Sequence, residues 1–482
     1  MFRSRFSPKH FLSLLLCLLS LLLAACGGAS SASSSSAPGN LNNGQPGSVG
    51  QNNATTTTLL SVPMPTTQTA CPQPFLAGRA PVMRKMTLGN DPTITYINDQ
   101  GTVPGANSFA ELKLYDTVKG RANAGSKLIF GKSVLVHTSG ALITEAQVSS
   151  DGQWVLFVTQ TLSASEIQLV RMDGQGLQTL YCAPPGTVHS LQWSPDASRF
   201  IFSQATLSGS WNLSLFDMAT GTIQPELVQS NNATQGYEAR TWFDNNRVYV
   251  VGVYVAGVPD SLAPVPTRGL FVLDTSQGPK QRPSDLFQII KPSSSSSCRS
   301  FDSDFNATIL ITSQCSQTFP TGSGPDGVGL LSGPSSIVAQ GVTGGSQRKI
   351  YTSQTQAVTQ VRMLGYASTS MLMTVNNLDA SGGMLPLSTP NGLWKINTDG
   401  SGLTNLASTD SFSECELNPF TQYPWANLSR DNRLYALTTQ AVLSKSRSIT
   451  LMVGSLSGGG TTAFENDSAN LGMLAIAGWT SM

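Results

Sequence analysis

Charge, histidine and long apolar runs are all scarce in this chain of 482 residues. Only 11% of the residues are charged, and no basic tract follows the first ten positions. A nucleic-acid-binding surface needs clustered Lys and Arg, so we expect no nucleic-acid partner. The three histidines are His10, His137 and His189, and the first lies in an N-terminal signal described next. Two remaining histidines exclude a histidine-rich metal site.

Catalytic motifs are also missing. There is no GxSxG elbow of the serine hydrolases, no CxxC pair and no GxxxxGK[ST] phosphate loop. We therefore predict no cofactor, no metal site and no catalytic residue from motifs alone.

The N-terminus has three basic residues followed by a short apolar run over residues 11–23. As a helix this run would be about 20 Å long at roughly 1.5 Å per residue, too short for a bilayer core of about 30 Å. It ends in Leu23-Ala24-Ala25-Cys26-Gly27. A basic head, an apolar run and small residues at its end predict a cleaved export signal over residues 1–25.

The sequence Leu-Ala-Ala-Cys-Gly resembles the lipobox of bacterial lipoproteins. In that family the cysteine is acylated after the signal is cut just before it, which implies a lipid such as palmitate on Cys26. The lipid bilayer would then be the first partner, and the protein would lie outside the cytoplasm on the cell membrane or the outer membrane. An ordinary secretory signal that happens to contain a cysteine is the alternative.

The next segment, residues 26–78, carries no charged residue and is rich in Ser, Thr, Gly and Asn. Such a composition cannot bury enough apolar surface to offset its ordering entropy, so we expect a disordered linker. Its mean reach would be roughly 35–40 Å. The linker would hold the folded part near a membrane without pressing it against the surface.

The folded part is expected over residues 79–482, with 25 basic and 27 acidic residues once the three basic residues of the signal are removed. Besides Cys17 and Cys26 the chain has five cysteines, of which Cys71 lies in the linker, and this odd number leaves at least one unpaired within the chain. Cys298 and Cys315 flank a predicted hairpin, and we expect them to form a disulfide. A pair between Cys71 and Cys415 is a weaker hypothesis from chain closure, and the pairing with Cys182 stays open.

One pattern of short strands recurs beyond the linker. Its clearest copy contains VHSLQW, SPDAS, RFIFSQ and WNLSLFDMATG, starting at Val188. Apolar strands separated by Asp, Asn and Gly turns are typical of antiparallel sheet. Four strands per unit, repeated about every 40–55 residues, predict an all-β fold, the β-propeller.

The turns Ser149-Ser150-Asp151-Gly152, Ser194-Pro195-Asp196 and Ser429-Arg430-Asp431-Asn432 resemble those of the periplasmic TolB propeller family and its WD-like repeats. We count seven blades, over residues 94–135, 144–182, 188–229, 238–290, 297–351, 358–407 and 425–466, with six to eight left open. The first lacks its opening strand, and the C-terminal residues 473–479 resemble that strand. We expect the C-terminus to complete the first blade and close the ring.

Several polar residues are predicted at the starts of the innermost strands, near the mouth of the central channel: Glu145, His189, Glu238, Arg240, Arg299 and Arg362. A structural role is the competing interpretation for each of them. For Asp151, Asp196, Asp244 and Asp431 we expect hydrogen bonding within turns. Trp193, Trp242 and Trp479 occupy equivalent positions of the repeat, which predicts packing between blades.

Two functions of different class fit these patterns. The first is a binding or scaffolding propeller whose long loops, at residues 98–110, 256–267, 316–327 and 376–390, face an envelope protein or a cell-wall glycan. The second is an enzyme of the lyase, lactonase or sugar-dehydrogenase type, acting at the channel mouth. Convergence of Glu238, Arg240 and His189 on one pocket would favour the enzyme.

Overall fold

The computed structural model describes the chain in segments, which are residues 70–71, 84–122, 131–205, 211–229, 235–242, 244–254, 269–290, 297–303, 308–318, 330–342, 345–365, 368–376, 391–409, 413–441, 448–467 and 472–482. The predicted signal peptide and nearly all of the predicted linker lie outside them. The chain divides into two units, residues 1–61 and 62–482, and every described residue belongs to the second.

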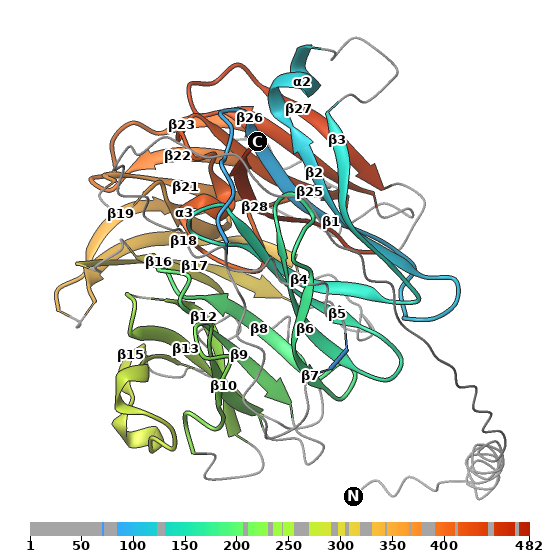
Figure 1. The fold of residues 1–482 in the computed structure, drawn as a ribbon. Helices are drawn as coiled ribbons and strands as arrows, with labels where there is room; N and C mark the ends of the chain where they lie inside the picture. Colours follow the sequence, from blue (N-terminus) through green and yellow to red (C-terminus); the bar gives the residue numbers. More distant parts are fainter. Residues whose placement is uncertain are drawn as a thin grey trace, which may run out of the picture. The chain divides into compact units, whose positions relative to one another are not determined.

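Strands make up most of the described chain and form seven antiparallel sheets of four strands each (Figure 1). In the first three blades, from the innermost strand outward, these are β28 (Leu474–Ser481), β1 (Pro92–Gln100), β2 (Phe109–Asp116) and β3 (Lys132–Ser139); β4 (Leu142–Val148), β5 (Trp154–Gln160), β6 (Ser165–Arg171) and β7 (Gln178–Ala183); and β8 (Val188–Trp193), β9 (Arg199–Ala205), β10 (Trp211–Asp217) and β11 (Ile223–Gln224).

The other four blades continue the same order. They are β12 (Gln235–Trp242), β13 (Arg247–Tyr254), β14 (Leu270–Asp274) and β15 (Phe287–Ile290); β16 (Ser297–Ser303), β17 (Ile309–Thr318), β18 (Leu330–Gly341) and β19 (Arg348–Ser353); β20 (Val358–Met363), β21 (Ser370–Val375), β22 (Gly392–Asn397) and β23 (Thr404–Ser408); and β24 (Ser413–Glu416), β25 (Leu434–Ala441), β26 (Ile449–Ser455) and β27 (Thr461–Asp467). The predicted seven-bladed β-propeller is confirmed.

The core lies between the blades, where seven apolar clusters occupy the seven interfaces between neighbours. Each sheet is therefore covered on both faces, which explains why a strand such as β5 is apolar almost throughout. Trp193, Trp242 and Trp479 are buried in three of these clusters, as predicted. Aromatic side chains of this size bury the most apolar area per residue and dominate such interfaces.

The hairpin turns are built by local hydrogen bonds. In blade 2 the Ser149 hydroxyl donates to Asp151 Oδ1 at 2.7 Å and accepts from the Trp154 amide at 3.1 Å. The same arrangement recurs in blade 3, where Ser194 bonds Asp196 at 2.6 Å and the Arg199 amide at 2.9 Å. The aspartates thus order the turns, as expected from their side-chain chemistry.

The two ends of the propeller meet in blade 1, where β28 pairs with β1 and places Trp479 opposite Ile94. Figure 1 shows these strands, coloured red and blue, side by side. The predicted closure by the C-terminal strand is confirmed. Pairing these two strands removes a pair of exposed sheet edges.

The last blade corrects a prediction. Its innermost strand is β24, at Ser413–Glu416, whereas the sequence pattern placed the start of the blade at Trp425. Trp425 lies in a single helical turn, α3 (Pro424–Asn427). Pro424 has no amide hydrogen to give to a ladder and its fixed φ suits the first position of a helix, so this segment forms a turn of helix.

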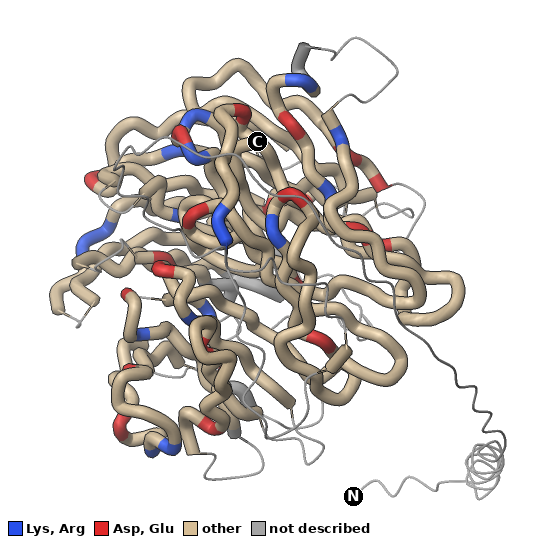
Figure 2. The backbone as a smooth tube through the Cα atoms, viewed as in Figure 1, with Lys and Arg blue, Asp and Glu red and all other residues tan. Residues whose placement is uncertain are grey.

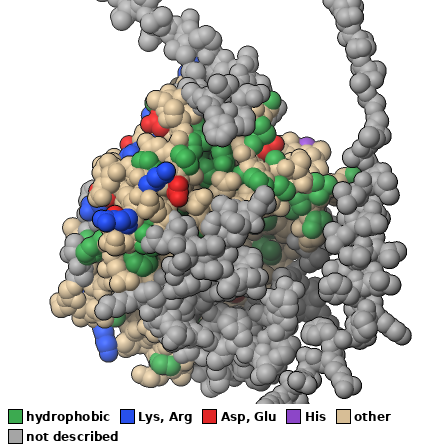
Figure 3. All heavy atoms as spheres, turned by 90° about the horizontal axis from the view of Figure 1, so that it is seen from below, with side chains coloured by type: hydrophobic (Ala, Val, Ile, Leu, Met, Phe, Trp, Pro, Cys, Tyr) green, Lys and Arg blue, Asp and Glu red, His purple; other side chains and the backbone are tan. Residues whose placement is uncertain are grey.

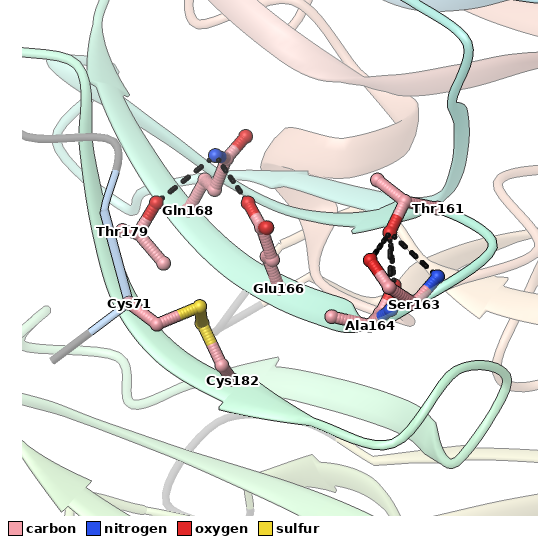
Figure 4. Close-up of a disulfide and its surroundings, with 8 residues drawn as sticks. All are labelled: Cys71, Thr161, Ser163, Ala164, Glu166, Gln168, Thr179 and Cys182. Carbon is pink, nitrogen blue, oxygen red and sulfur yellow. Dashed lines mark hydrogen bonds between the residues drawn. A yellow bond between two sulfur atoms is a disulfide. The ribbon is translucent and has the colours of Figure 1, made fainter. Parts of the chain in front are cut away.

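The cysteines correct a second prediction. Cys71 is bonded to Cys182 on β7, with Cα atoms 5.8 Å apart (Figure 4), and Cys415 is a buried free thiol. The hypothesis that joined Cys71 to Cys415 is wrong, because Cys71 pairs with the outermost strand of blade 2 whereas Cys415 is buried on β24, the innermost strand of blade 7. Strand pairing sets Cys298 opposite Cys315, and Cys315 is disulfide-bonded. The side chain of Cys298 lies outside the described residues, so that pair stays a prediction.

Helical segments are short. Besides α3 they are α2 (Thr117–Ala122) and the 3-10 turns η2 (Thr275–Gln277) and η3 (Pro283–Asp285). Within the described segments, no helix is both long enough and apolar enough to cross a membrane. Basic and acidic positions are dispersed over the described chain (Figure 2).

Candidate functional site

Residues 417–427, here called the crossing segment, leave the inner edge of blade 7 and contact blades on the other sides of the ring. The Leu417 amide donates to Gln360 Oε1 of blade 6 at 2.8 Å, and Asn418 Nδ2 donates to the Ile476 carbonyl of blade 1 at 2.9 Å. Gln192 Nε2 of blade 3 donates to the Phe420 carbonyl at 2.7 Å. A segment bonded to blades around the ring occupies the space at its centre.

Tyr423 of the crossing segment is buried and contacts two blades. Its hydroxyl donates to the Trp193 carbonyl at 2.6 Å and accepts from the Trp242 amide at 3.2 Å, so it joins blades 3 and 4. Its ring stacks on Trp425 with centroids 4.3 Å apart, and the Trp425 indole donates to the Val148 carbonyl of blade 2 at 3.2 Å. The crossing segment therefore joins the inner strands of blades 2, 3 and 4 through two aromatic side chains.

Glu145, on β4, is bonded to the backbone of the neighbouring blade. Its two carboxylate oxygens accept the amides of Ser190 and Leu191, each at 2.7 Å. Ser190 has a φ of +54°, and the register of β8 shifts between His189 and Gln192, so a bulge turns both amides toward Glu145. Burial raises the pKa of Glu145 to about 7, although the two amides favour its ionised form.

Ser190 extends this set of bonds to blade 4. Its hydroxyl donates to Glu238 Oε1, and Arg240 donates to Glu238 Oε2 at 2.9 Å. His189 does not join the set, since its Nε2 lies 3.0 Å from the carbonyl of Gly186, in the connection before β8, and its ring packs on Trp211 with centroids 4.9 Å apart. Burial lowers the pKa of His189.

Arg362, on β20, lies in a separate set on the opposite blades. It donates to the Val361 carbonyl at 2.8 Å and to Ser300 Oγ at 3.3 Å, and Asp302 accepts the Met363 amide at 2.6 Å. Burial lowers the pKa of Arg362, and the charges of Asp302 and Glu416 oppose that shift. The side chain of Arg299 lies outside the described residues.

The predicted channel-mouth residues thus fall into two sets rather than one pocket. Glu145, Glu238 and Arg240 are joined through Ser190, while Arg362 lies apart with Ser300 and Asp302. Glu145 and Glu238 are bonded to blade 3 and Arg362 is bonded to blade 5, while Arg240 bonds Glu238 of its own strand. This arrangement holds the inner strands together, which is a structural task.

A hollow of about 590 Å³ opens where blades 1, 2 and 7 meet, and we call it the Asp99 hollow. It lies at the ends of β1, β5 and β25 and the starts of β4, β26 and β28, beside the crossing segment. Its lining comprises Asp99, Gly101, Thr102, Val103, Pro104, Leu142, Ile143, Thr144, Gln160, Glu416, Pro419, Phe420, Thr438, Gln440, Ile449, Gly472, Met473, Leu474 and Ala475. Its volume is typical of small-molecule sites.

The four long loops predicted to crowd one face are described only in part. The first runs over residues 101–108 between β1 and β2 and contributes Val103 and Pro104 to the Asp99 hollow. The loops at 256–267 and 376–390, except for Asn376, lie outside the described residues, as do residues 319–327 of the loop at 316–327.

Sequence patterns missed both the crossing segment and the Asp99 hollow. One signal was present, because residues 417–427 read LNPFTQYPWAN, with two prolines, three aromatic residues and no charge. That composition is unusual for an exposed loop. Asp99 offered no signal, since it precedes Gln100-Gly101 and resembles any aspartate before a turn.

No protein-family model matches this chain, and no curated protein matches it. Among solved structures it is similar to TolB from Acinetobacter baumannii, at 12% identity and a TM-score of 0.37 over 64% of this chain and 61% of TolB. A prolyl endopeptidase matches at 14% identity and a TM-score of 0.46, over 80% of this chain and 49% of the enzyme. An oligogalacturonate lyase in complex with manganese matches at 11% identity and a TM-score of 0.43, over 77% of this chain and 94% of the lyase.

This chain therefore spans less than two thirds of TolB and about half of the prolyl endopeptidase. At these identities and scores the similarities carry no argument about activity. The assignment of the chain to the seven-bladed β-propeller fold rests on its own strand pairing.

Proposed function

We propose that this protein is a lipid-anchored binding module, whose propeller recognises an envelope protein or a cell-wall glycan outside the cytoplasm. The lipobox-like sequence at Cys26 and the uncharged linker support the location. The face that carries the blade-to-blade connections, with the loop at 101–108 and the Asp99 hollow, is the proposed binding face.

The observation that carries this proposal is how the channel is used. The crossing segment bonds blades 1, 3, 4 and 6 from inside the ring. Two carboxyl groups of the inner strands bond the neighbouring blade 3: Glu145 accepts its backbone amides and Glu238 accepts the Ser190 hydroxyl, while Arg240 bonds Glu238 within blade 4. Groups committed to holding blades together are poor acids, bases or ligands for a substrate, because a reacting group must be free to exchange a proton or a bond.

The alternative is a propeller enzyme of the lyase, lactonase or sugar-dehydrogenase type. One observation favours it, the pKa of about 7 at Glu145, since perturbed carboxyl groups cluster at functional sites. Its two backbone hydrogen bonds across the blade interface argue for a structural role. An active enzyme would turn over a sugar or lactone substrate, and turnover would fall sharply in Glu145→Gln.

Membrane attachment is tested by Cys26→Ser. We expect the unchanged chain in the membrane fraction, with an N-terminal peptide whose mass includes acyl chains. Without the thiol no lipid can be added, so Cys26→Ser should leave that fraction. Equal distribution of the two proteins would refute the lipid anchor.

Partner binding is tested by co-purification of the lipidated protein from gently solubilised envelopes. One variant shortens the four loops at residues 98–110, 256–267, 316–327 and 376–390, and a matched control shortens the turn at residues 456–460 on the opposite face. A stoichiometric partner kept by the control and lost by the four-loop variant supports the proposal. A partner retained by both variants, or the absence of any partner, contradicts the proposed face.

A further inference from the structure

We propose that the Asp99 hollow binds a protonated primary amine carried on an apolar stem, with Asp99 as the counter-ion. This inference deepens the proposed binding function and rests on it. It follows from the position of one carboxyl group, from the charge of the lining and from the apolar rim.

Asp99 is held rigidly at the end of β1. Its amide donates to the Met473 carbonyl at 2.8 Å, and its Oδ2 accepts the Ile143 amide at 3.1 Å. The residue is only 2% exposed, and its Oδ1 has no hydrogen-bond partner among the described residues. Buried polar atoms usually have a partner in folded proteins, and Asp99 belongs to the lining of the hollow, so a cationic group bound there would supply the missing partner.

The lining selects a cation over an anion. Among the described residues that form it, Asp99 and Glu416 are the only ionisable ones, and none is Lys, Arg or His. A buried carboxylate without a cation loses several kcal/mol of hydration energy. A bound ammonium group would compensate for the lost hydration energy through a charge-assisted hydrogen bond.

The apolar lining selects an organic amine over a metal ion. Calcium needs six to eight converging oxygens, and in the described chain the only three-residue cluster with ligand spacing is the disulfide-bonded Cys71 and Cys182 with Glu166. Leu142, Phe420, Val103 and Met473 instead offer apolar contacts.

The apolar rim is also accessible. Val103 is 69% exposed and Met473 is 37% exposed, and large exposed hydrophobic side chains are few in the described chain. Hydrophobic side chains gather on the face seen in Figure 3, with most charged side chains to one side of them. Exposed apolar groups beside a buried charge match a ligand with a stem and a cationic head.

The protonation state of Asp99 provides an internal reporter. Burial raises the pKa of Asp99 to about 8, and the Ile143 amide only partly opposes this shift, so the empty site is mainly neutral at pH 7. Burial also raises the pKa of Glu416, the other titratable group of the lining, and the Arg362 charge opposes that shift. An ammonium ion stabilises the ionised carboxylate, so binding at pH 7 should release close to one proton.

The test is calorimetric titration of the full lipidated chain in detergent with three four-carbon probes that differ in their head group: n-butylamine, 1-butanol and butyrate. We expect n-butylamine to bind at one site, 1-butanol to bind at least tenfold more weakly, and butyrate not to bind. Titration of n-butylamine in two buffers of different ionisation enthalpy should report the released proton. Nα-acetyl-lysine amide distinguishes a lysine side chain from a free amine as the natural source.

Asp99→Asn keeps an acceptor for the Ile143 amide and removes the charge. We expect it to lower the affinity for n-butylamine at least tenfold and to abolish the release of a proton on binding. The control Asp399→Asn, which changes an exposed turn carboxylate of blade 6, should leave the affinity and the proton release unchanged. Unchanged n-butylamine binding in Asp99→Asn, or equal binding of n-butylamine and 1-butanol, would overturn the inference. Failure of amine binding while a co-purified partner persists would reject this site and leave the proposed function standing.

Discussion

Replacing Tyr423 with Phe tests whether the crossing segment stabilises the ring from inside. The change removes only a hydroxyl group, which joins the Trp193 carbonyl of blade 3 to the Trp242 amide of blade 4. The ring of residue 423 remains stacked on Trp425, so the apolar contacts are retained.

The expected loss of stability follows from the two backbone groups that bond the Tyr423 hydroxyl. Each buried backbone group left without a hydrogen bond costs about 1–3 kcal/mol. Some relaxation of the segment would recover part of this cost, so we expect Tyr423→Phe to lower the free energy of unfolding by about 2–4 kcal/mol. Equilibrium unfolding in urea, followed by tryptophan fluorescence, measures this change.

Tyr181→Phe is the matched control, because its hydroxyl makes one bond, to Gln204 Oε1 at 2.8 Å, in a half-buried position. We expect this variant to lose less than about 1 kcal/mol. Hydrogen exchange at the Trp242 amide should accelerate in Tyr423→Phe alone. The reasoning would be refuted if the two variants were equally stable.

Three further changes test other features. Cys71→Ser and Cys182→Ser should each lower stability by the same amount, about 4 kcal/mol, because the bond closes a loop of 111 residues; unequal urea midpoints would contradict this. The pKa of Asp99 is raised from 3.8 to about 8 in the folded chain, so its stabilising effect is complete below pH 4 and lost as pH rises to about 8. The melting temperature should therefore fall more between pH 5 and pH 9 in the unchanged chain than in Asp99→Asn, and parallel curves would exclude this cause. Gly392→Ala should cost at least about 2 kcal/mol more than Gly458→Ala. Both have positive φ, but a Cβ at 392 would lie 2.0 Å from the Ala407 carbonyl oxygen while one at 458 would meet nothing within 4 Å, and similar urea midpoints would contradict this expectation.

The fold could be predicted because its signals are local. Ser149, Asp151 and Trp154 make their turn within six positions, and the same turn recurs at Ser194 and Ser429. The closing strand could be found because its sequence resembles the other inner strands. Hydrogen bonds between residues close in sequence require a short sequence pattern, and the repetition of that pattern makes it easier to identify.

The site could not be predicted in the same way because its bonds join distant residues. Tyr423 meets Trp193 across 230 positions, and Gln192 meets Phe420 across 228. Asp99 is buried by Met473 and Ile143, which lie in other parts of the chain. The predicted start of blade 7 was wrong because Trp425 resembles the tryptophans of the inner strands. Pro424 directly before it favours a helical turn, and Trp425 lies in α3.

The pairing of Cys71 with Cys182 determines how a mechanical load enters the propeller. The described chain resumes at residue 84 and leads into β1, which pairs with β28 to close the ring. A pull on the chain before Cys71 is carried by the disulfide to β7, the outermost strand of blade 2. The seam between β1 and β28 is thereby unloaded, so tension from an anchor would strain one outer strand and leave the closure of the ring at rest.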